Sequence, residues 1–429
     1  MPPYHAPARG VLPDFSTSQP PASGGCCLLD TDSRHPPSVA AAKDLTSKPV
    51  VAVSRYTSPD TMAAVIRSGG QDMIGAARPS IADPFLPQKI EQGRTEDIRE
   101  CIGCNICYAH DSLGVPIRCT QNPTMGEEWR LGWHPERVAP AARPERVLIV
   151  GAGPAGLEAA RVLGEAGHSV MLAEAQRTLG GRVTREARLP GLSEWARVRD
   201  WRVGQLDKLN TVEIFLESPM TAPDIIELGV DHVIFATGSR WSADTVGRHS
   251  ATGLIKEMPG RLISLEAVLG GQSIDAEHVL IYDDDHYYIG SVAALALRAA
   301  GHRVTLVTPA GRPCEFGVYT GEIYSSNARL FEAGVEVVTN QQIIAVEDGF
   351  VRTECSMSGR AGTLDCDVMI PVCRRVPVTD VHAALTELSI NDPAGAAASI
   401  RSVSRIGDAE APNTIAAAVY AGYRAGVVT

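Results

Sequence analysis

The chain has 429 residues and a formal net charge of −11. One domain usually holds ~100–200 residues, so we expect more than one hydrophobic core. The acidic balance, without a cluster of Lys and Arg, argues against a nucleic-acid partner. No window has the ~18 apolar residues of a membrane span, and the N-terminal stretch "MPPYHAPARGVLPDF" lacks a signal-peptide core, so the cytoplasm is the expected compartment.

The amino-acid composition and the apolar pattern of the first part of the chain change near Lys48. Residues 1–45 are rich in Pro, Ser, Ala and Gly without a sustained apolar period, which predicts a poorly ordered segment. A βαβα unit, the C-terminal part of a TIM barrel, is expected over residues 46–98. The elements of this unit are a strand over 49–53, a helix opened by Ser58 and Pro59, a strand over 72–76 and a helix that starts near Ala82. Two strand–helix pairs are only a quarter of an eight-fold barrel, which needs ~250 residues.

Four of the ten cysteines crowd into "CIGCNICYAHDSLGVPIRC", with the spacing C-x2-C-x2-C-x11-C. In a reducing compartment such crowding predicts a metal site rather than disulfides. Three thiolates on one tight loop and a fourth from a nearby turn match the ligation of a [4Fe-4S] cluster. Structural zinc, which prefers paired C-x2-C knuckles, is the alternative, and His110 is a further candidate ligand. The expected ligands are Cys101, Cys104, Cys107 and Cys119, in an iron–sulfur loop and linker over 99–143.

A glycine-rich turn follows in "VLIVGAGPAGLEAARVL", directly after an apolar strand and at the start of a helix. Pyrophosphate is expected on this helix N-terminus, where free backbone N–H groups favour anions. Glu174, about twenty residues further on, is placed to accept hydrogen bonds from ribose hydroxyls. Further Gly turns stand at "LGGR", "FATGS" and near the C-terminus. The expected nucleotide contacts are Gly151, Gly153, Pro154, Ala155, Gly156, Glu174, Gly181, Arg182, Thr237, Gly238, Gly407 and Asp408.

The strand pattern after residue 143 predicts a doubly wound α/β region with two nucleotide-binding modules, because βαβ units of similar layout begin at Val147 and Val279. The first module is assigned to residues 144–270 and 380–429, and the second to 271–379. The expected strands are 147–150, 170–173, 212–215, 232–236, 279–282, 304–307 and 335–338.

The second module departs from the nucleotide-binding pattern. Where glycines would follow its first strand, the chain has Asp283, Asp284 and Asp285. Carboxylates at this place repel a pyrophosphate by ~1 kcal/mol per close pair even in water. We therefore expect this module to bind NAD(P)H poorly and to be vestigial. An additional role for the aspartates is to cap the following helix.

Several stretches resemble the trimethylamine and dimethylamine dehydrogenase branch of the Old Yellow Enzyme-related flavoproteins, whose close relatives are the 2,4-dienoyl-CoA reductases. The resemblance covers roughly residues 46–426. It implies an N-terminal FMN barrel, of which this chain keeps the end, a [4Fe-4S] cluster at the barrel edge, and a C-terminal region that binds FAD or ADP. The stretches that carry it include "KPVVAVSRYTSPDTM", "IGAARPSIADPFLPQKIEQGR", "RECIGCNIC", "RCTQNPTMGEEWRLGWHPE" and "VIFATGSRW".

The resemblance also implies roles for individual residues. The four cysteines of the loop become the cluster ligands, and Arg55, Ala77 and Arg78 belong to loops that hold the FMN phosphate. Family members carry their catalytic residues on earlier barrel strands, which this chain lacks. No catalytic residue is therefore carried over, and most of the FMN cradle lies outside the chain.

The expected function is that of an iron–sulfur flavoprotein oxidoreductase that passes electrons from a flavin through a [4Fe-4S] cluster to an external acceptor. The resemblance suggests an electron-transfer flavoprotein as that acceptor. One alternative is a truncated electron-relay or nucleotide-binding module without substrate chemistry. An NAD(P)H-dependent reductase of the 2,4-dienoyl-CoA type is another. A separate chain that completes the barrel and a homo-oligomer are left open.

Overall fold

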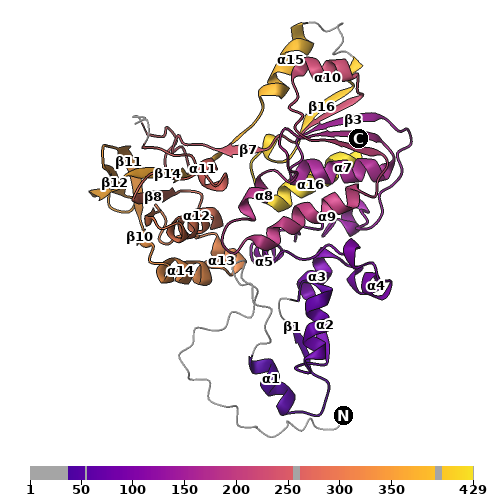
Figure 1. Ribbon diagram of the computed structural model, residues 1–429, viewed down its shortest axis with the longest axis horizontal. Helices are drawn as coiled ribbons and strands as arrows, with labels where there is room; N and C mark the ends of the chain where they lie inside the picture. Colours follow the sequence, from indigo (N-terminus) through magenta and orange to yellow (C-terminus); the bar gives the residue numbers. More distant parts are fainter. Residues whose placement is uncertain (1–36, 54–55, 255–260, 392–398, 429) are drawn as a thin grey trace, which may run out of the picture.

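The computed structural model describes residues 37–53, 56–254, 261–391 and 399–428. An N-terminal unit, indigo in Figure 1, lies below two α/β modules that stand side by side. The α/β class predicted from the sequence is confirmed. No helix of the described ranges has the length and apolar character needed to cross a membrane.

The N-terminal unit is small. A parallel pair of short strands, with Val51 opposite Met73, packs on helices around a core that includes Tyr56, Met62 and Leu86. In the described residues, no further strand pairs with these two. The elements are α1 (Pro37–Asp44), β1 (Val51–Val53), α2 (Pro59–Arg67), β2 (Met73–Gly75), α3 (Ala77–Ala82) and α4 (Leu86–Glu91).

Two predictions for this unit need correction. Residues 1–36 lie outside the described ranges, but the end of the segment predicted to be poorly ordered forms α1. The helix predicted to start near Ala82 is wrong, because α3 ends there and α4 begins at Leu86. Pro84 explains the break: a residue before proline avoids the helical region, and Asp83 has φ −138° and ψ 97°.

The first module is a parallel sheet in the order β16-β6-β3-β4-β5 with helices on both faces. α7, α9 and α16 cover one face, and α10 packs with α15 on the other (Figure 1). The strands are β3 (Arg146–Val150), β4 (Ser169–Ala173), β5 (Val212–Phe215), β6 (His232–Phe235) and β16 (Ser402–Arg405). The helices are α7 (Pro154–Ala166), α8 (Arg182–Glu186), α9 (Ala196–Leu206), α10 (Ala222–Leu228), α15 (Asp380–Asn391) and α16 (Ile415–Val428).

The second module has a parallel sheet in the order β10-β9-β8-β14. Its strands are β8 (His278–Asp283), β9 (Arg303–Val307), β10 (Glu336–Val338) and β14 (Val368–Val372), and its helices are α11 (Leu265–Leu269), α12 (Tyr288–Ala299), α13 (Gly317–Thr320) and α14 (Ile323–Glu332). A three-stranded antiparallel sheet packs on the face opposite α12. It consists of β11 (Gln341–Val346), β12 (Phe350–Cys355) and β13 (Ala361–Asp365).

All seven strands predicted for the two modules are confirmed, but β14, β16 and the antiparallel sheet were not predicted. β14 contains Pro371, which argues against a central strand. The proline is tolerated because β14 stands at the edge of its sheet.

The cysteine segment lies where the three parts of the molecule meet. It carries α5 (Ile106–Ser112) and α6 (Glu128–Leu131), and α5 packs against α13 of the second module. The amide of Asn105 donates to the carbonyl of Thr320 at 2.8 Å. One apolar core includes Ile102, Trp195 and Ile281, so the loop shares its packing with both modules.

The close packing of α16 on α7 yields a stability prediction. A side chain at Gly422 would place Cβ 2.2 Å from the carbonyl oxygen of Ala155, whereas Cβ at Gly204 of α9 would meet nothing within 4 Å. Gly422→Ala should therefore lower the free energy of unfolding by about 1–3 kcal/mol. Gly204→Ala, the matched helical control, should raise it slightly through helix propensity. Chemical denaturation of both variants measures the difference, and equal effects would contradict this account of the packing.

Candidate functional site: the cysteine loop and the nucleotide cleft

The four predicted cluster cysteines come together around one small cavity. Arg78, Ile81, Ile102 and Asn105 line it with them. The backbone N–H groups of Gly103 and Gln121 donate to the sulfurs of Cys101 and Cys119, each at 3.4 Å. The hydroxyl of Thr120 lies 3.0 Å from the sulfur of Cys104. Such donors to the sulfurs are among the features by which a protein tunes a bound cluster.

The electrostatics of this cavity suit a bound cation. Loss of solvent raises the pKa of Cys104 and Cys107, and raises that of Cys119 to about 12. Neighbouring cysteines raise the pKa of Cys104 and Cys119 further, because thiolates repel one another. Without a positive group, these thiols stay protonated at neutral pH. A metal centre supplies the positive charge that turns such thiols into thiolate ligands.

Four thiols around one cavity form a donor set for either metal alternative, a [4Fe-4S] cluster or a structural zinc ion. Nδ1 of His110 lies 2.9 Å from the carbonyl oxygen of Pro116, and this residue does not line the cavity.

A cleft of about 610 Å³ opens where β3 and β4 end and α7 begins. Of the predicted nucleotide residues, all except Gly156 and Gly407 line it. Those that do are Gly151, Gly153, Pro154, Ala155, Glu174, Gly181, Arg182, Thr237, Gly238 and Asp408.

The three positions of the first turn carry glycine, which has no side chain, for different physical reasons. Gly151 has φ 103°, and a Cβ there would lie 2.5 Å from the carbonyl oxygen of Ala236. A Cβ on Gly156 would lie 2.0 Å from the carbonyl oxygen of Gly151, so this glycine lets α7 pack on the turn. A Cβ on Gly153 would meet nothing within 4 Å, because this residue faces the open cleft. No side chain caps α7, so its first N–H groups are available to an anion.

Glu174 is held at the end of β4 by backbone donors. Its two carboxylate oxygens accept from the N–H groups of Ala152 and Gln176, each at 2.9 Å. Each oxygen has a second lone pair. The carboxylate can therefore accept a ribose hydroxyl without giving up the bonds that fix it.

Asp408 links three segments at the far end of the cleft. One of its oxygens accepts from Arg182 at 3.2 Å, Ser239 at 2.8 Å and Arg375 at 2.5 Å. Ser239 and Arg375 belong to β7 (Ser239–Trp241) and β15 (Arg375–Pro377), an antiparallel pair between the modules. Sequence reasoning missed both residues, because neither strand of three residues carries a recognisable pattern.

A second cavity of about 350 Å³ lies between the cleft and the cysteines. It shares Arg182, Thr414 and Ile415 with the cleft, and Cys104 and Thr120 with the cysteine cavity. Five aromatic side chains line this aromatic cavity together with the charged groups of Arg182, Arg248, Asp285 and Arg375; the aromatic residues are Trp195, Trp241, Tyr287, Tyr288 and Phe316. The three cavities thus form a row that connects the two predicted sites.

A buried ion cluster also connects them. Glu158 of α7 lies 2.6 Å from Arg161 and 2.7 Å from Arg202 of α9. Arg202 donates to the side-chain oxygen of Gln121 at 3.0 Å, two residues beyond Cys119. Burial alone would raise the pKa of Glu158, but the two guanidinium groups outweigh it and the pKa is lowered.

The comparisons with known proteins agree with this geometry. The NADH:flavin oxidoreductase / NADH oxidase family matches residues 30–97, and an NAD(P)-binding Rossmann-like domain matches 149–200. Dimethylamine dehydrogenase of Hyphomicrobium sp. is 40% identical over 413 residues, which are 89% of this chain and 55% of that protein. The predicted resemblance to the amine dehydrogenases is confirmed.

Two solved structures extend the comparison. Histamine dehydrogenase from Rhizobium sp. 4-9 is 45% identical with a TM-score of 0.87, over 91% of this chain and 56% of that one. The 6-hydroxypseudooxynicotine amine oxidase from Pseudomonas geniculata N1 is 42% identical with the same TM-score, over 91% and 58%. The chain thus spans a little more than half the length of these amine dehydrogenase relatives.

The residues predicted to hold FMN lie apart from the nucleotide cleft. Arg55 is outside the described residues. Ala77 is the first residue of α3, and Arg78 donates to the side chain of Asn105 at 2.5 Å beside the cysteines. The structure therefore brings Arg78 to the cysteine loop.

The aspartates of the second module do not cap α12, so this prediction was wrong. α12 has Tyr287 at its N-cap position, and no side chain accepts from its first N–H groups. Asp283 instead accepts from the N–H of His286 at 3.1 Å, and Asp284 contacts His249 and His286.

Replacement of Glu158 tests the buried ion cluster. Glu158→Gln should lower the free energy of unfolding at pH 7 by about 3–5 kcal/mol, because two guanidinium groups lose their counter-charge. The lowered pKa means that the stabilisation is present above the ordinary value of 4.5 and is lost as the pH falls, so the difference should narrow at acid pH. Denaturation at several pH values measures it.

Glu165→Gln is the matched control, since this carboxylate lies on the same helix and pairs with Arg161 while 28% exposed. It should cost less than about 1 kcal/mol. A similar cost for both variants, or a difference independent of pH, would contradict the role given to Glu158.

Proposed function

We propose that the chain acts in an iron–sulfur flavoprotein oxidoreductase of the amine dehydrogenase type, in which electrons pass from a flavin through a [4Fe-4S] cluster to an external acceptor. The convergence of four cysteine thiols on one cavity that Arg78 also lines carries the proposal, because it sets a cluster site beside a residue of the predicted FMN loop. One further cavity shares wall residues with both the cysteine cavity and the nucleotide cleft. The similarity to dimethylamine and histamine dehydrogenases supports it.

Cys101, Cys104, Cys107 and Cys119 would hold the cluster. When bound, such a cluster takes up and releases one electron at a time. The N–H groups of Gly103 and Gln121 direct partial positive charge to the sulfurs. Gln121 is fixed in turn by Arg202. The loop is therefore held in place from the nucleotide-binding helix.

In the nucleotide cleft, the features favour ADP over FAD. Gly153 leaves room for phosphate at the α7 N-terminus, and Glu174 suits a ribose. Arg182 stands where the cleft meets the aromatic cavity, and it bridges Glu186 and Asp408 at 3.2 Å each. A flavin ring entering the aromatic cavity would have to displace this ion pair. ADP would leave it intact.

The second module supports a dehydrogenase rather than an NAD(P)H-dependent reductase. Burial raises the pKa of Asp283 to about 7 and also raises that of Asp285. Charging these groups is already unfavourable, so a pyrophosphate beside them would add further repulsion. The loop that carries His249 also lies against this turn. We therefore propose that nicotinamide nucleotides are not the electron source.

FMN and the acceptor belong to the same proposal. The match of residues 30–97 to the flavin oxidoreductase family supports an FMN site that involves Ala77, Arg78 and Arg55. An electron-transfer flavoprotein is the proposed acceptor, and a further chain that supplies the rest of an FMN barrel is the proposed source of substrate contacts.

The cluster proposal predicts a defined metal content. Anaerobic reconstitution should give roughly four iron and four sulfide per chain, with a visible absorption that dithionite bleaches and ferrocenium restores. Cys104→Ser should lower the iron content, whereas Cys355→Ser should leave it unchanged, because Cys355 lies on β12 away from the loop. Zinc as the sole bound metal would overturn the proposal.

The nucleotide proposal predicts what acid releases from the purified chain. Chromatography of the released material should show ADP, and Gly153→Val should reduce its amount at least about tenfold by filling the phosphate position. The free energy of unfolding without nucleotide should change little, since a Cβ at Gly153 meets nothing within 4 Å. Release of FAD would show that Arg182 yields to a flavin ring. The same nucleotide content in the parent chain and in Gly153→Val would show that the nucleotide binds outside this cleft.

A further inference from the structure

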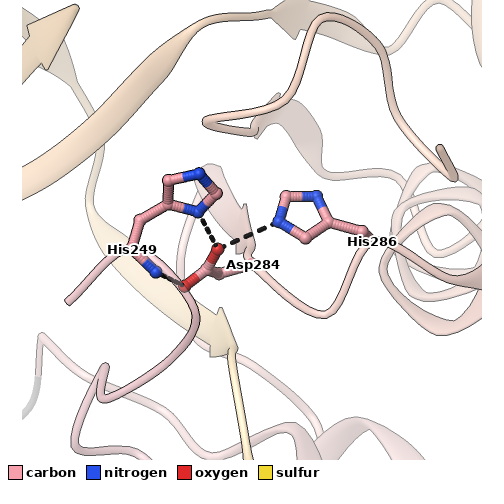
Figure 2. A group of neighbouring side chains, drawn as sticks. All are labelled: His249, Asp284 and His286. Atoms are coloured by element: carbon pink, nitrogen blue, oxygen red, sulfur yellow. Dashed lines mark hydrogen bonds and ion pairs between the residues drawn. The ribbon is translucent and has the colours of Figure 1, made fainter. Parts of the chain in front are cut away.

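Three side chains converge at the end of β8, outside the row of cavities. Nδ1 of His249 lies 2.6 Å from Oδ1 of Asp284, and Nε2 of His286 lies 3.0 Å from the same oxygen. One donor atom from each of the three residues lies within 4.8 Å of the other two. Figure 2 shows the two rings with one nitrogen each turned toward the carboxylate that stands between them.

The backbone holds this cluster in place. Asp284 directly follows β8, is fully buried, and donates its N–H to Val372 of the neighbouring strand at 2.9 Å. Its second oxygen accepts from the N–H of His249 at 3.0 Å. A Cβ at Gly247 would lie 2.2 Å from that oxygen, so only a glycine lets the loop approach this closely. The donor atoms are therefore positioned before any ligand arrives.

Two imidazole nitrogens and one carboxylate oxygen form a donor set that zinc and related divalent ions prefer. A tetrahedral zinc would set neighbouring ligand atoms about 3.4 Å apart. The distances of 2.6 and 3.0 Å would have to widen by about 0.8 and 0.4 Å to reach this spacing. His249 is 37% exposed, so its ring can rotate, and solvent can reach a fourth coordination position.

The Asp284 carboxylate supplies the negative charge that a cation would meet in this cluster. Asp283 and Asp284 are both fully buried, and Asp285 follows them. The Oδ2 atom of Asp283 has no hydrogen-bond partner. Two ring protons shared with Asp284 offset part of this negative charge. A divalent ion in their place offsets more of it, because it adds two positive charges at the shared oxygen.

We propose that His249, Asp284 and His286 bind a divalent transition-metal ion of the zinc class, with one coordination position open to solvent. The ion would fasten the loop of residues 244–254 to the turn after β8. A nicotinamide pyrophosphate would dock at this turn. The bound metal would therefore block nucleotide binding by the second module. The site does not depend on the cluster or on the proposed electron transfer.

Zinc titration of the full chain with its [4Fe-4S] cluster in place tests this site. After dialysis against a chelator, the protein should bind one equivalent of Zn²⁺ in competition with a chromophoric chelator. His249→Ala and His286→Ala should each weaken this binding by about 100-fold or more, since even second-shell losses cost 10–100-fold. His382→Ala is the control and should bind as the parent does, because His382 packs on Phe235 in the first module.

Cobalt supplies a second readout that separates this site from the cysteines. Co²⁺ bound here should show ligand-field absorption of a nitrogen–oxygen site without thiolate charge transfer. His249→Ala should abolish this signal while the protein keeps its iron and its unfolding transition. Three results would overturn the proposal. They are no zinc bound by the parent, the same zinc affinity in the parent as in His249→Ala and His286→Ala, or a cobalt spectrum with thiolate bands only.

Discussion

The contact of Glu158 with Arg202 is the interaction on which the arrangement of both sites depends. Neither side chain is exposed, and burying two charges is unfavourable unless they are paired and hydrogen-bonded. Arg202 meets this condition through Glu158, the carbonyl of Val198 and the amide of Gln121. Glu158 lies one turn into the helix that begins at the nucleotide cleft. The position of the cysteine loop is therefore set by the same helix that would bind phosphate.

The second module contributes packing to this centre in addition to its own fold. α13 contacts α5, and the core around Trp195 continues into the strands of the second sheet. Asp408 gathers Arg182 and Arg375 from either side of the boundary between modules. The second module thus also forms a wall of the interior that holds the cysteine loop.

Much of this organisation could be predicted from the sequence because it rests on local patterns. Apolar runs located seven strands, the spacing of four cysteines located the loop, and glycines at a strand–helix turn located the cleft. Contacts between distant residues could not be predicted. Arg202 and Gln121 are polar residues without a distinctive neighbourhood, and His249 lies 35 positions before Asp284. The aspartates were assigned to helix capping because sequence order does not show that a histidine loop folds over them.

The contact between Asn105 and Thr320 has a consequence for biosynthesis. These residues are 215 positions apart, so the cysteine loop leaves the ribosome long before the helix that covers it. Until α13 exists, the four thiols are reachable from the side that the second module later covers. Delivery of iron and sulfide for the proposed cluster would therefore be easiest before the modules dock. In a chain that has completed its folding, the shared core around Ile102 and Trp195 already packs beside the loop.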